Sequence, residues 1–189
     1  MAKGNERKLE ELILHISQKC ANDKTFGSIK LNKILCYSDF TFYVYNGHGI
    51  TDVDYQKLAN GPAPRRLVPV RDKMIRKGHM GLQQIKLKSG NVMKRPVNLR
   101  EPDLSLFSGE EIAVVDSVIE WLKETSSQRV TEVSHELVGW AVAEVGHTIP
   151  YRTFYFSNPP LSEDEGFRAR ELFAKMRSKS KKSRDASAA

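Results

Sequence analysis

The chain has 189 residues, of which 40% are hydrophobic and 28% are charged, a composition typical of a globular protein rather than a disordered one. No stretch is apolar over the roughly 18 residues that a membrane-spanning helix needs. The first residues also lack the apolar run of a secretion signal. These features predict a cytoplasmic protein without a membrane anchor. Cys20 and Cys36 provide no disulfide framework and are expected to be reduced core thiols.

The net charge of +7 is unevenly distributed along the sequence. Residues 167–189 contain eight basic and two acidic side chains, a net charge of +6, so the remaining residues sum to +1. The basic character is therefore assigned to the C-terminal tail. Such a tail is expected to be solvated and to attract nucleic acid only weakly, through phosphate contacts that salt disrupts.

Apolar residues recur at helical spacing in the first third of the chain. The pattern predicts a helix over residues 6–20 and a second helix over residues 29–45, capped by Ser28 and ended at Gly47. After an extended piece at residues 50–58, the segment Asn60–Pro64 is expected to be a turn, because each proline disfavours helical geometry in the residue before it.

The middle of the chain mixes helix and hairpin signals. A third helix is predicted over Arg65–Lys77, and residues 82–88 and 92–97 are predicted to pair as a β-hairpin. Ser108 and Glu111 have the spacing of a capping box, which predicts the start of another helix.

Two further helices are expected from Thr131 to Val138 and over residues 162–177. The fold class is therefore mainly α (α+β), a compact helical domain with one small β-hairpin. Residues 1–160 are expected to form this domain, and residues 161–189 a C-terminal helix followed by a basic disordered tail.

The sequence contains none of the local motifs that identify an enzyme or a metal site. Its five histidines show no metal-ligand spacing, and it has neither a Gly-rich phosphate loop nor a nucleophile elbow. No catalytic residue, metal or cofactor is predicted. An enzyme built on Asp39 and His135 is the least favoured alternative.

Asp39 and His135 nevertheless fall on apolar helix faces. A buried carboxylate needs hydrogen-bond donors, so Asp39 is expected to be a structural residue bonded to backbone amides or to a tyrosine, in preference to a functional group. His135 is likewise expected to be a core histidine that bonds a neighbour, in preference to a proton shuttle.

The second predicted helix carries more aromatic residues than one face can hold: Tyr37, Phe40, Phe42, Tyr43 and Tyr45. Core packing explains some of these rings, and an exposed apolar groove for a protein partner explains the rest. Residues 109–151 also have the order of a helix–turn–helix with a wing. The candidate recognition helix carries Glu132 and Glu136 and no Arg or Lys, which disfavours DNA recognition by that helix.

An ordered set of short motifs extends over about residues 10–155. It comprises Lys30–Phe40, Gly47, Ile50-Thr51, Tyr55, Gly61–Pro64, Asp103–Ser108, Ser134-His135-Glu136, Trp140 and Ile149–Tyr151. Together these residues resemble the Panacea domain, the SocA-like antitoxin family. Cys36 and Val138-Gly139 depart from the residues more usual in that family.

The resemblance implies a mainly helical, noncatalytic antitoxin of a bacterial or phage toxin–antitoxin system that neutralises a toxin by direct protein–protein binding. It leaves open a proteolytic adaptor that delivers the toxin to a Clp-type protease and a DNA-binding autoregulator. Expected partner contacts are Tyr43, Tyr55 and Arg65. Expected scaffold residues are Asp39, Gly61, Pro62, His135 and Trp140.

Overall fold

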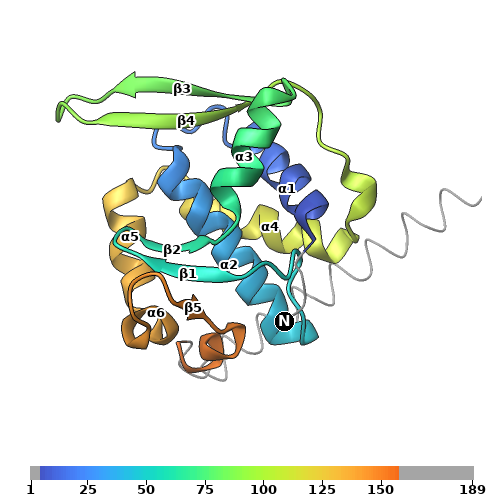
Figure 1. Cartoon of the computed structure of the whole chain (residues 1–189), viewed down its shortest axis with the longest axis vertical. Helices are drawn as coiled ribbons and strands as arrows, with labels where there is room; N and C mark the ends of the chain where they lie inside the picture. Colours follow the sequence, from blue (N-terminus) through green and yellow to red (C-terminus); the bar gives the residue numbers. More distant parts are fainter. Residues whose placement is uncertain (1–4, 158–189) are drawn as a thin grey trace, which may run out of the picture. The chain divides into compact units, whose positions relative to one another are not determined.

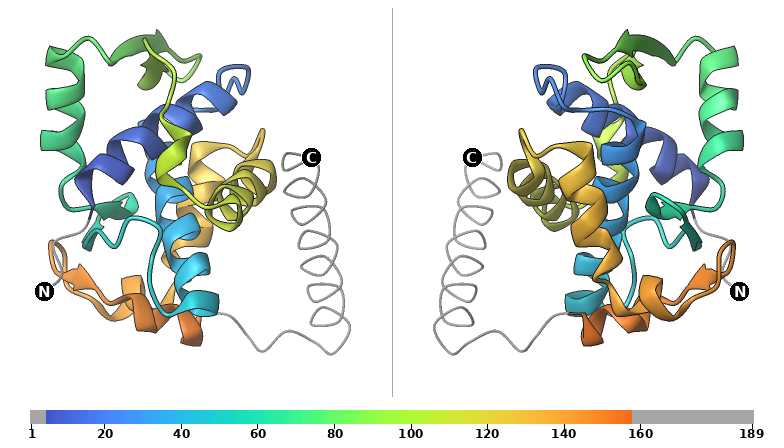
Figure 2. Two further views of the ribbon diagram at one scale, coloured as in Figure 1. Left: turned by 90° about the vertical axis from the view of Figure 1, so that its right-hand side faces the viewer. Right: turned by 90° about the vertical axis from the view of Figure 1, so that its left-hand side faces the viewer.

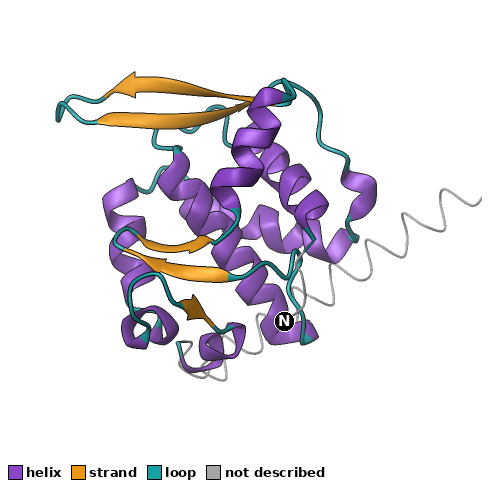
Figure 3. Ribbon diagram, viewed as in Figure 1, coloured by secondary structure: helices purple, strands orange, loops and turns teal. Residues whose placement is uncertain are grey.

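The computed structural model describes residues 5–157. Helices dominate this part of the chain, accompanied by two small antiparallel sheets (Figures 1 and 3), which confirms the mainly α fold class. No helix within it is long and apolar enough to cross a membrane. The helix expected over residues 162–177 and the basic tail lie outside the described residues, and the domain boundary near residue 160 stays a prediction.

Helix α2, Ser28–Asn46, lies at the centre of the fold (Figure 1). Apolar side chains occur around its whole circumference, so the helix is stable only where other elements cover it on several sides. It ends at Gly47, whose φ of 75° is the left-handed conformation that glycine adopts without strain. Ser28 does not cap it: the N-cap is Gly27, and the Ser28 hydroxyl donates to the carbonyl of Lys94 instead.

The helices around α2 are α1 (Glu6–Lys19), α4 (Gly109–Leu122) and α5 (Ser127–His135). Helix α1 matches its predicted range to within a residue, and α4 begins with the predicted capping box, both of whose hydrogen bonds form. The expected start of α5 at Thr131 is wrong, because Ser126 caps the helix one turn earlier. Thr131 lies inside the helix and donates its hydroxyl to the carbonyl of Ser127.

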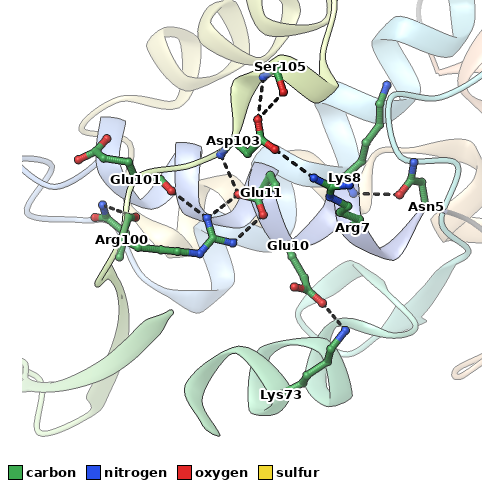
Figure 4. A network of polar contacts seen from close by, with 11 residues as sticks. Asn5, Arg7, Lys8, Glu10, Glu11, Lys73, Arg100, Glu101, Asp103 and Ser105 are labelled. Carbon is green, nitrogen blue, oxygen red and sulfur yellow. Dashed lines mark hydrogen bonds and ion pairs between the residues drawn. The ribbon is translucent and has the colours of Figure 1, made fainter. Parts of the chain in front are cut away.

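A polar network joins α1 to its neighbours (Figure 4). Arg100 donates through two nitrogens to the buried Glu11 carboxylate, at 2.8 and 2.6 Å, and the Asp103 amide donates to it at 2.8 Å. Burial alone would raise the pKa of Glu11, but these donors hold it below its ordinary value. Glu10 accepts from Lys73, which lies in α3 (Leu67–Arg76).

The first sheet has the strand order β2-β1-β5 and packs against α2. Its strands are β1 (Tyr55–Leu58), β2 (Gly61–Pro64) and β5 (Thr148–Ile149). The expected turn over Asn60–Pro64 is therefore wrong, since residues 61–64 pair with β1 throughout. Two prolines are tolerated because β2 is an edge strand, where their missing N–H groups interrupt no inner ladder.

The second sheet is the predicted hairpin, formed by β3 (Met80–Lys86) and β4 (Val92–Asn98). It extends past the helices at the top of Figure 1. Three short elements escaped the sequence patterns: η1 (Leu104–Leu106), α6 (Val138–Val142) and η2 (Tyr151–Phe156). Each is too short to show a period, so tertiary packing determines it.

Candidate protein-interaction site

Asp39 anchors the loop that leads into β1. Its carboxylate is fully buried and accepts from the Thr51 amide at 2.7 Å, from the Thr51 hydroxyl and from the Tyr55 hydroxyl at 2.8 Å. Burial raises the pKa of Asp39 to about 6, although these three donors act in the opposite direction. The expected hydrogen bonds of Asp39, to a backbone amide and to a tyrosine, are confirmed, and its purely structural role stays a prediction.

Lys33 holds the turn between β1 and β2. Its ammonium group is buried with no carboxylate partner among residues 5–157 and donates to the carbonyls of Asn60 and Pro62. Burial lowers the pKa of Lys33 to about 8. Gly61 has a φ of 93°, and a β-carbon there would collide with Lys33 and with the Ser134 hydroxyl, so glycine is required both by the backbone and by the space.

His135 and Trp140 cover the same turn from the outside. Their rings are stacked, with centroids 3.7 Å apart, and the Trp140 indole donates to the carbonyl of Leu58 at 3.1 Å. The Lys57 ammonium lies 4.2 Å from the indole centroid, which adds a cation–π contact. His135 is half-buried, so its expected place in the core is wrong, whereas the expected bond to a neighbour is formed with the backbone of Ala59. Partial burial and the nearby Lys33 lower its pKa.

The expected scaffold residues thus surround one small hairpin, with Asp39 at the Tyr55 end of β1 and His135 with Trp140 at its Leu58 end. A four-residue strand separates these ends by about 10 Å. Asp39 and His135 therefore do not meet, and the geometry offers no support for an enzyme built on that pair. No group of His, Cys, Asp or Glu within residues 5–157 is placed to hold a metal ion.

The three expected partner contacts fall in different environments. Tyr55 is fully buried, since β1 turns its side chain toward α2, where the hydroxyl bonds Asp39. Its side chain is therefore unavailable to a partner, and that expectation is wrong. Tyr43 is half-buried and packs against Tyr151, whereas Arg65 is exposed and donates to the Gly146 carbonyl at 2.8 Å. A contact role for Tyr43 and Arg65 stays a prediction.

An exposed aromatic cluster was missed by the sequence patterns. It links α4, α2 and η2 through ring contacts: Trp121 meets Tyr37 at 4.9 Å, and Tyr37 meets Phe154 at 6.2 Å. Beyond Phe154, η2 exposes two further rings. Tyr37 and Phe154 are themselves buried, so we give the name aromatic surface to the three exposed rings: Trp121, Tyr155 and Phe156. Trp121, Tyr155 and Phe156 are 54%, 49% and 75% exposed.

The sequence did carry one signal for this surface. The apolar stripe of α4 runs through Val115, Val118 and Leu122, and Trp121 lies outside that stripe. A tryptophan on the polar side of an amphipathic helix is an unusual exposed apolar group. Tyr37 below it is almost fully buried, and its hydroxyl has no hydrogen-bond partner among residues 5–157.

Carboxylates accompany the aromatic surface. Residues 109–145 contain eight acidic and two basic side chains, and four of these carboxylates are held in ion pairs: Glu111, Asp116, Glu120 and Glu132. Glu120 precedes Trp121, Glu124 follows it by three residues, and both are exposed. The Glu136 carboxylate is close enough to Tyr37 to contribute to the raised pKa of that phenol. The surface therefore combines apolar rings with a negative rim.

Two cavities, of about 220 and 440 Å³, lie beside polar clusters of residues 5–157. One of about 220 Å³ is lined by Lys8, His48, Thr51 and Glu111, among others, and Asp39 is not exposed to it. Its walls come from loop backbone and an ion pair between Lys8 and Glu111 at 2.6 Å. It has no apolar enclosure of the kind that small-molecule sites show.

Residues 31–141, more than half of the chain, match the family model described as antitoxin SocA-like, Panacea domain. The chain belongs to this family, which confirms the resemblance. No curated protein and no solved structure matches it.

Proposed function

We propose that the chain is a cytoplasmic antitoxin of a bacterial or phage toxin–antitoxin system, and that it neutralises a toxin noncatalytically by direct binding. Family membership supports the antitoxin role. The observation that supports direct binding is the exposed aromatic surface, because aromatic side chains anchor the energetic centres of protein interfaces.

The proposed docking site is the aromatic surface with its acidic rim. Trp121, Tyr155 and Phe156 supply exposed apolar area from two separate elements, α4 and η2. The exposed Glu124 and Glu136, which form no ion pair among residues 5–157, favour a partner surface that carries Lys or Arg around an apolar centre. Such a complementary rim accelerates association, while the buried rings slow dissociation.

Co-expression with the protein encoded by the neighbouring gene tests this proposal. The neighbour should arrest growth alone and be harmless beside the wild-type chain. Trp121→Ala should weaken the complex by about 10- to 100-fold, as expected for a central tryptophan anchor. Val68→Ala is the matched control, since Val68 is 53% exposed and lies in α3, on the other side of α2 from α4 (Figure 2).

Two results would overturn the proposal. A neighbour that is harmless alone removes the antitoxin role, and an unchanged affinity of Trp121→Ala with Phe156→Ala removes the docking site. The adaptor alternative is separated by repeating the assay in cells without Clp-type proteases. Direct binding predicts full protection there and an undiminished amount of toxin, whereas delivery to a protease predicts loss of protection.

A further inference from the structure

The region from α3 to the end of β4 carries an unbalanced positive charge. Residues 73–100 contain eight Lys or Arg residues and no Asp or Glu. The net charge of residues 1–166 is nevertheless only +1, because the acidic segment 109–145 offsets this excess of positive charge. The two segments are also apart in space: α3 lies on the other side of α2 from α4, and the β3–β4 hairpin lies at the Ser28 end of α2 (Figure 2).

Three of these eight cations have structural partners. Lys73 pairs with Glu10 at 2.6 Å, Arg100 pairs with Glu11 at 2.6 Å, and Arg95 donates to the Ala21 carbonyl at 3.0 Å. The other five are exposed, and none forms an ion pair with any residue from 5 to 157. We call them the basic ribbon: Arg76, Lys77, Lys86, Lys88 and Lys94.

The β3–β4 register places two of these cations on one exposed face of the hairpin, while Arg76 and Lys77 lie at the end of α3. Lys94 pairs with Gln84, and Lys86 pairs with Val92, so Lys86 and Lys94 share one face as diagonal neighbours about 7–8 Å apart. Arg95 points to the opposite face and fastens the hairpin to the loop between α1 and α2. Lys88 lies in the exposed turn at the tip of the hairpin.

We propose that the basic ribbon binds double-stranded DNA by placing the β3–β4 hairpin in the major groove. That groove admits a two-stranded antiparallel ribbon, and cations without nearby carboxylates suit its phosphate walls. The deep, narrow major groove of an RNA duplex does not admit such a ribbon. Single strands are disfavoured because residues 73–100 contain no Phe, Tyr or Trp on which bases could stack.

The basic ribbon is distinct from the two other segments that could contact nucleic acid, the carboxylate-bearing α5 and the basic tail. Most of its contacts would be to phosphates, so the expected binding is largely independent of base sequence and falls steeply with salt. The proposal does not rest on the antitoxin function, because the aromatic surface is formed by other elements.

The test uses the full chain and a labelled 30-base-pair DNA duplex of arbitrary sequence, with affinity measured by fluorescence anisotropy between 50 and 200 mM salt. The variant Lys86→Gln/Lys88→Gln/Lys94→Gln should bind about 10-fold more weakly or worse at 100 mM salt. Its slope of log affinity against log salt should be shallower by about 2–3, as expected for three lost phosphate contacts. The matched control removes three charges from the tail, with Lys179→Gln/Lys181→Gln/Lys182→Gln.

The control should retain most of the affinity and slope, and an RNA duplex of equal length should bind about 10-fold more weakly than the DNA. The proposal is overturned if the wild-type chain does not bind DNA, if the tail variant loses binding while the hairpin variant keeps it, or if the RNA duplex binds equally well. The proposal is also overturned if the hairpin variant binds DNA as tightly as the wild type but no longer binds the toxin. That result would assign the basic ribbon to a protein interface instead. Matching thermal unfolding of both variants and the wild type shows that the fold is intact.

Discussion

The two hairpins of this protein differ in what their polar groups contact. In the β1–β2 hairpin, all four residues of β2 are buried, its turn accepts hydrogen bonds from the buried Lys33 of α2, and Lys57 donates to the carbonyl of Ala143. In the β3–β4 hairpin, Lys86 and Lys94 lie on an exposed face and form no ion pair among the described residues. The same local structure thus serves as part of the scaffold in one place and offers an unbalanced charge to solvent in the other.

This difference follows from neighbours rather than from strand geometry. The β1–β2 hairpin lies against α2 and α5, which supply Asp39, Lys33 and Ser134 to it. The β3–β4 hairpin is fastened mainly through β4, by Arg95 and by Ser28, and its tip extends beyond its support. Substitutions should therefore affect stability at the first hairpin and binding at the second.

The largest expected effect on stability is that of Asp39→Ala. The substitution removes the acceptor of three buried donors, from Thr51 and Tyr55, and each unpaired buried group costs about 1–3 kcal/mol. We expect the free energy of unfolding to fall by about 3 kcal/mol or more in chemical denaturation. The matched control is Asp54→Ala, which removes an exposed carboxylate from the same loop. It should change the free energy of unfolding by less than about 0.5 kcal/mol. Equal effects of the two variants would contradict the anchoring role of Asp39.

The stability contributed by Asp39 should also depend on pH. Burial raises its pKa from 3.8 to about 6, so the folded chain keeps this proton to a higher pH than the unfolded chain does. The stability that this raised pKa contributes is therefore fully present below about pH 4 and is lost as the pH rises through 6. The free energy of unfolding falls by about 3 kcal/mol over this range.

Asp39→Asn cannot ionise and isolates this effect from the other carboxylates. The stability of the wild type relative to Asp39→Asn should fall between pH 4 and pH 7 when both are unfolded with urea. A difference that stays constant, or that grows with pH, would show that Asp39 is already ionised at low pH in the folded chain.

A smaller effect separates the turns of the two hairpins. Gly61 and Gly90 both have positive φ, 93° and 85°, so alanine strains the backbone at either position by about 1–2 kcal/mol. Only at Gly61 would the new β-carbon meet other atoms, those of Lys33 and Ser134. Gly61→Ala should therefore destabilise the fold by about 1–3 kcal/mol more than Gly90→Ala does. In thermal unfolding, its melting temperature should be the lower of the two. Equal losses would mean that the first turn relaxes as freely as the second.

Sequence patterns predicted those parts of the fold in which the signal is local. The stripe of α1, the capping box of Ser108 and the β3–β4 hairpin each require only a few neighbouring residues. The strand β2 was missed because its prolines resemble a turn until a partner strand and the adjacent helix are present. Tyr55 was misplaced for a related reason: one tyrosine in a short strand carries no signal for which face is buried.

The candidate surfaces were harder to predict than the fold. Trp121 of α4 is linked to η2 through Tyr37 and Phe154, which lie far from it in the sequence, so the proximity of these rings depends on tertiary packing. The basic ribbon was present in the sequence, but a single net charge for a long stretch concealed it. A local count over residues 73–100 would have found it.

The central claim is that this antitoxin-family chain binds its toxin directly through the aromatic surface. Its most direct test is the dissociation constant of the wild-type chain and of Trp121→Ala with the purified product of the neighbouring gene, measured by calorimetry at one salt concentration. The account predicts a defined complex with the wild type and an affinity about 10- to 100-fold lower for Trp121→Ala. Equal dissociation constants for the two chains, or no complex with the wild type, would contradict it.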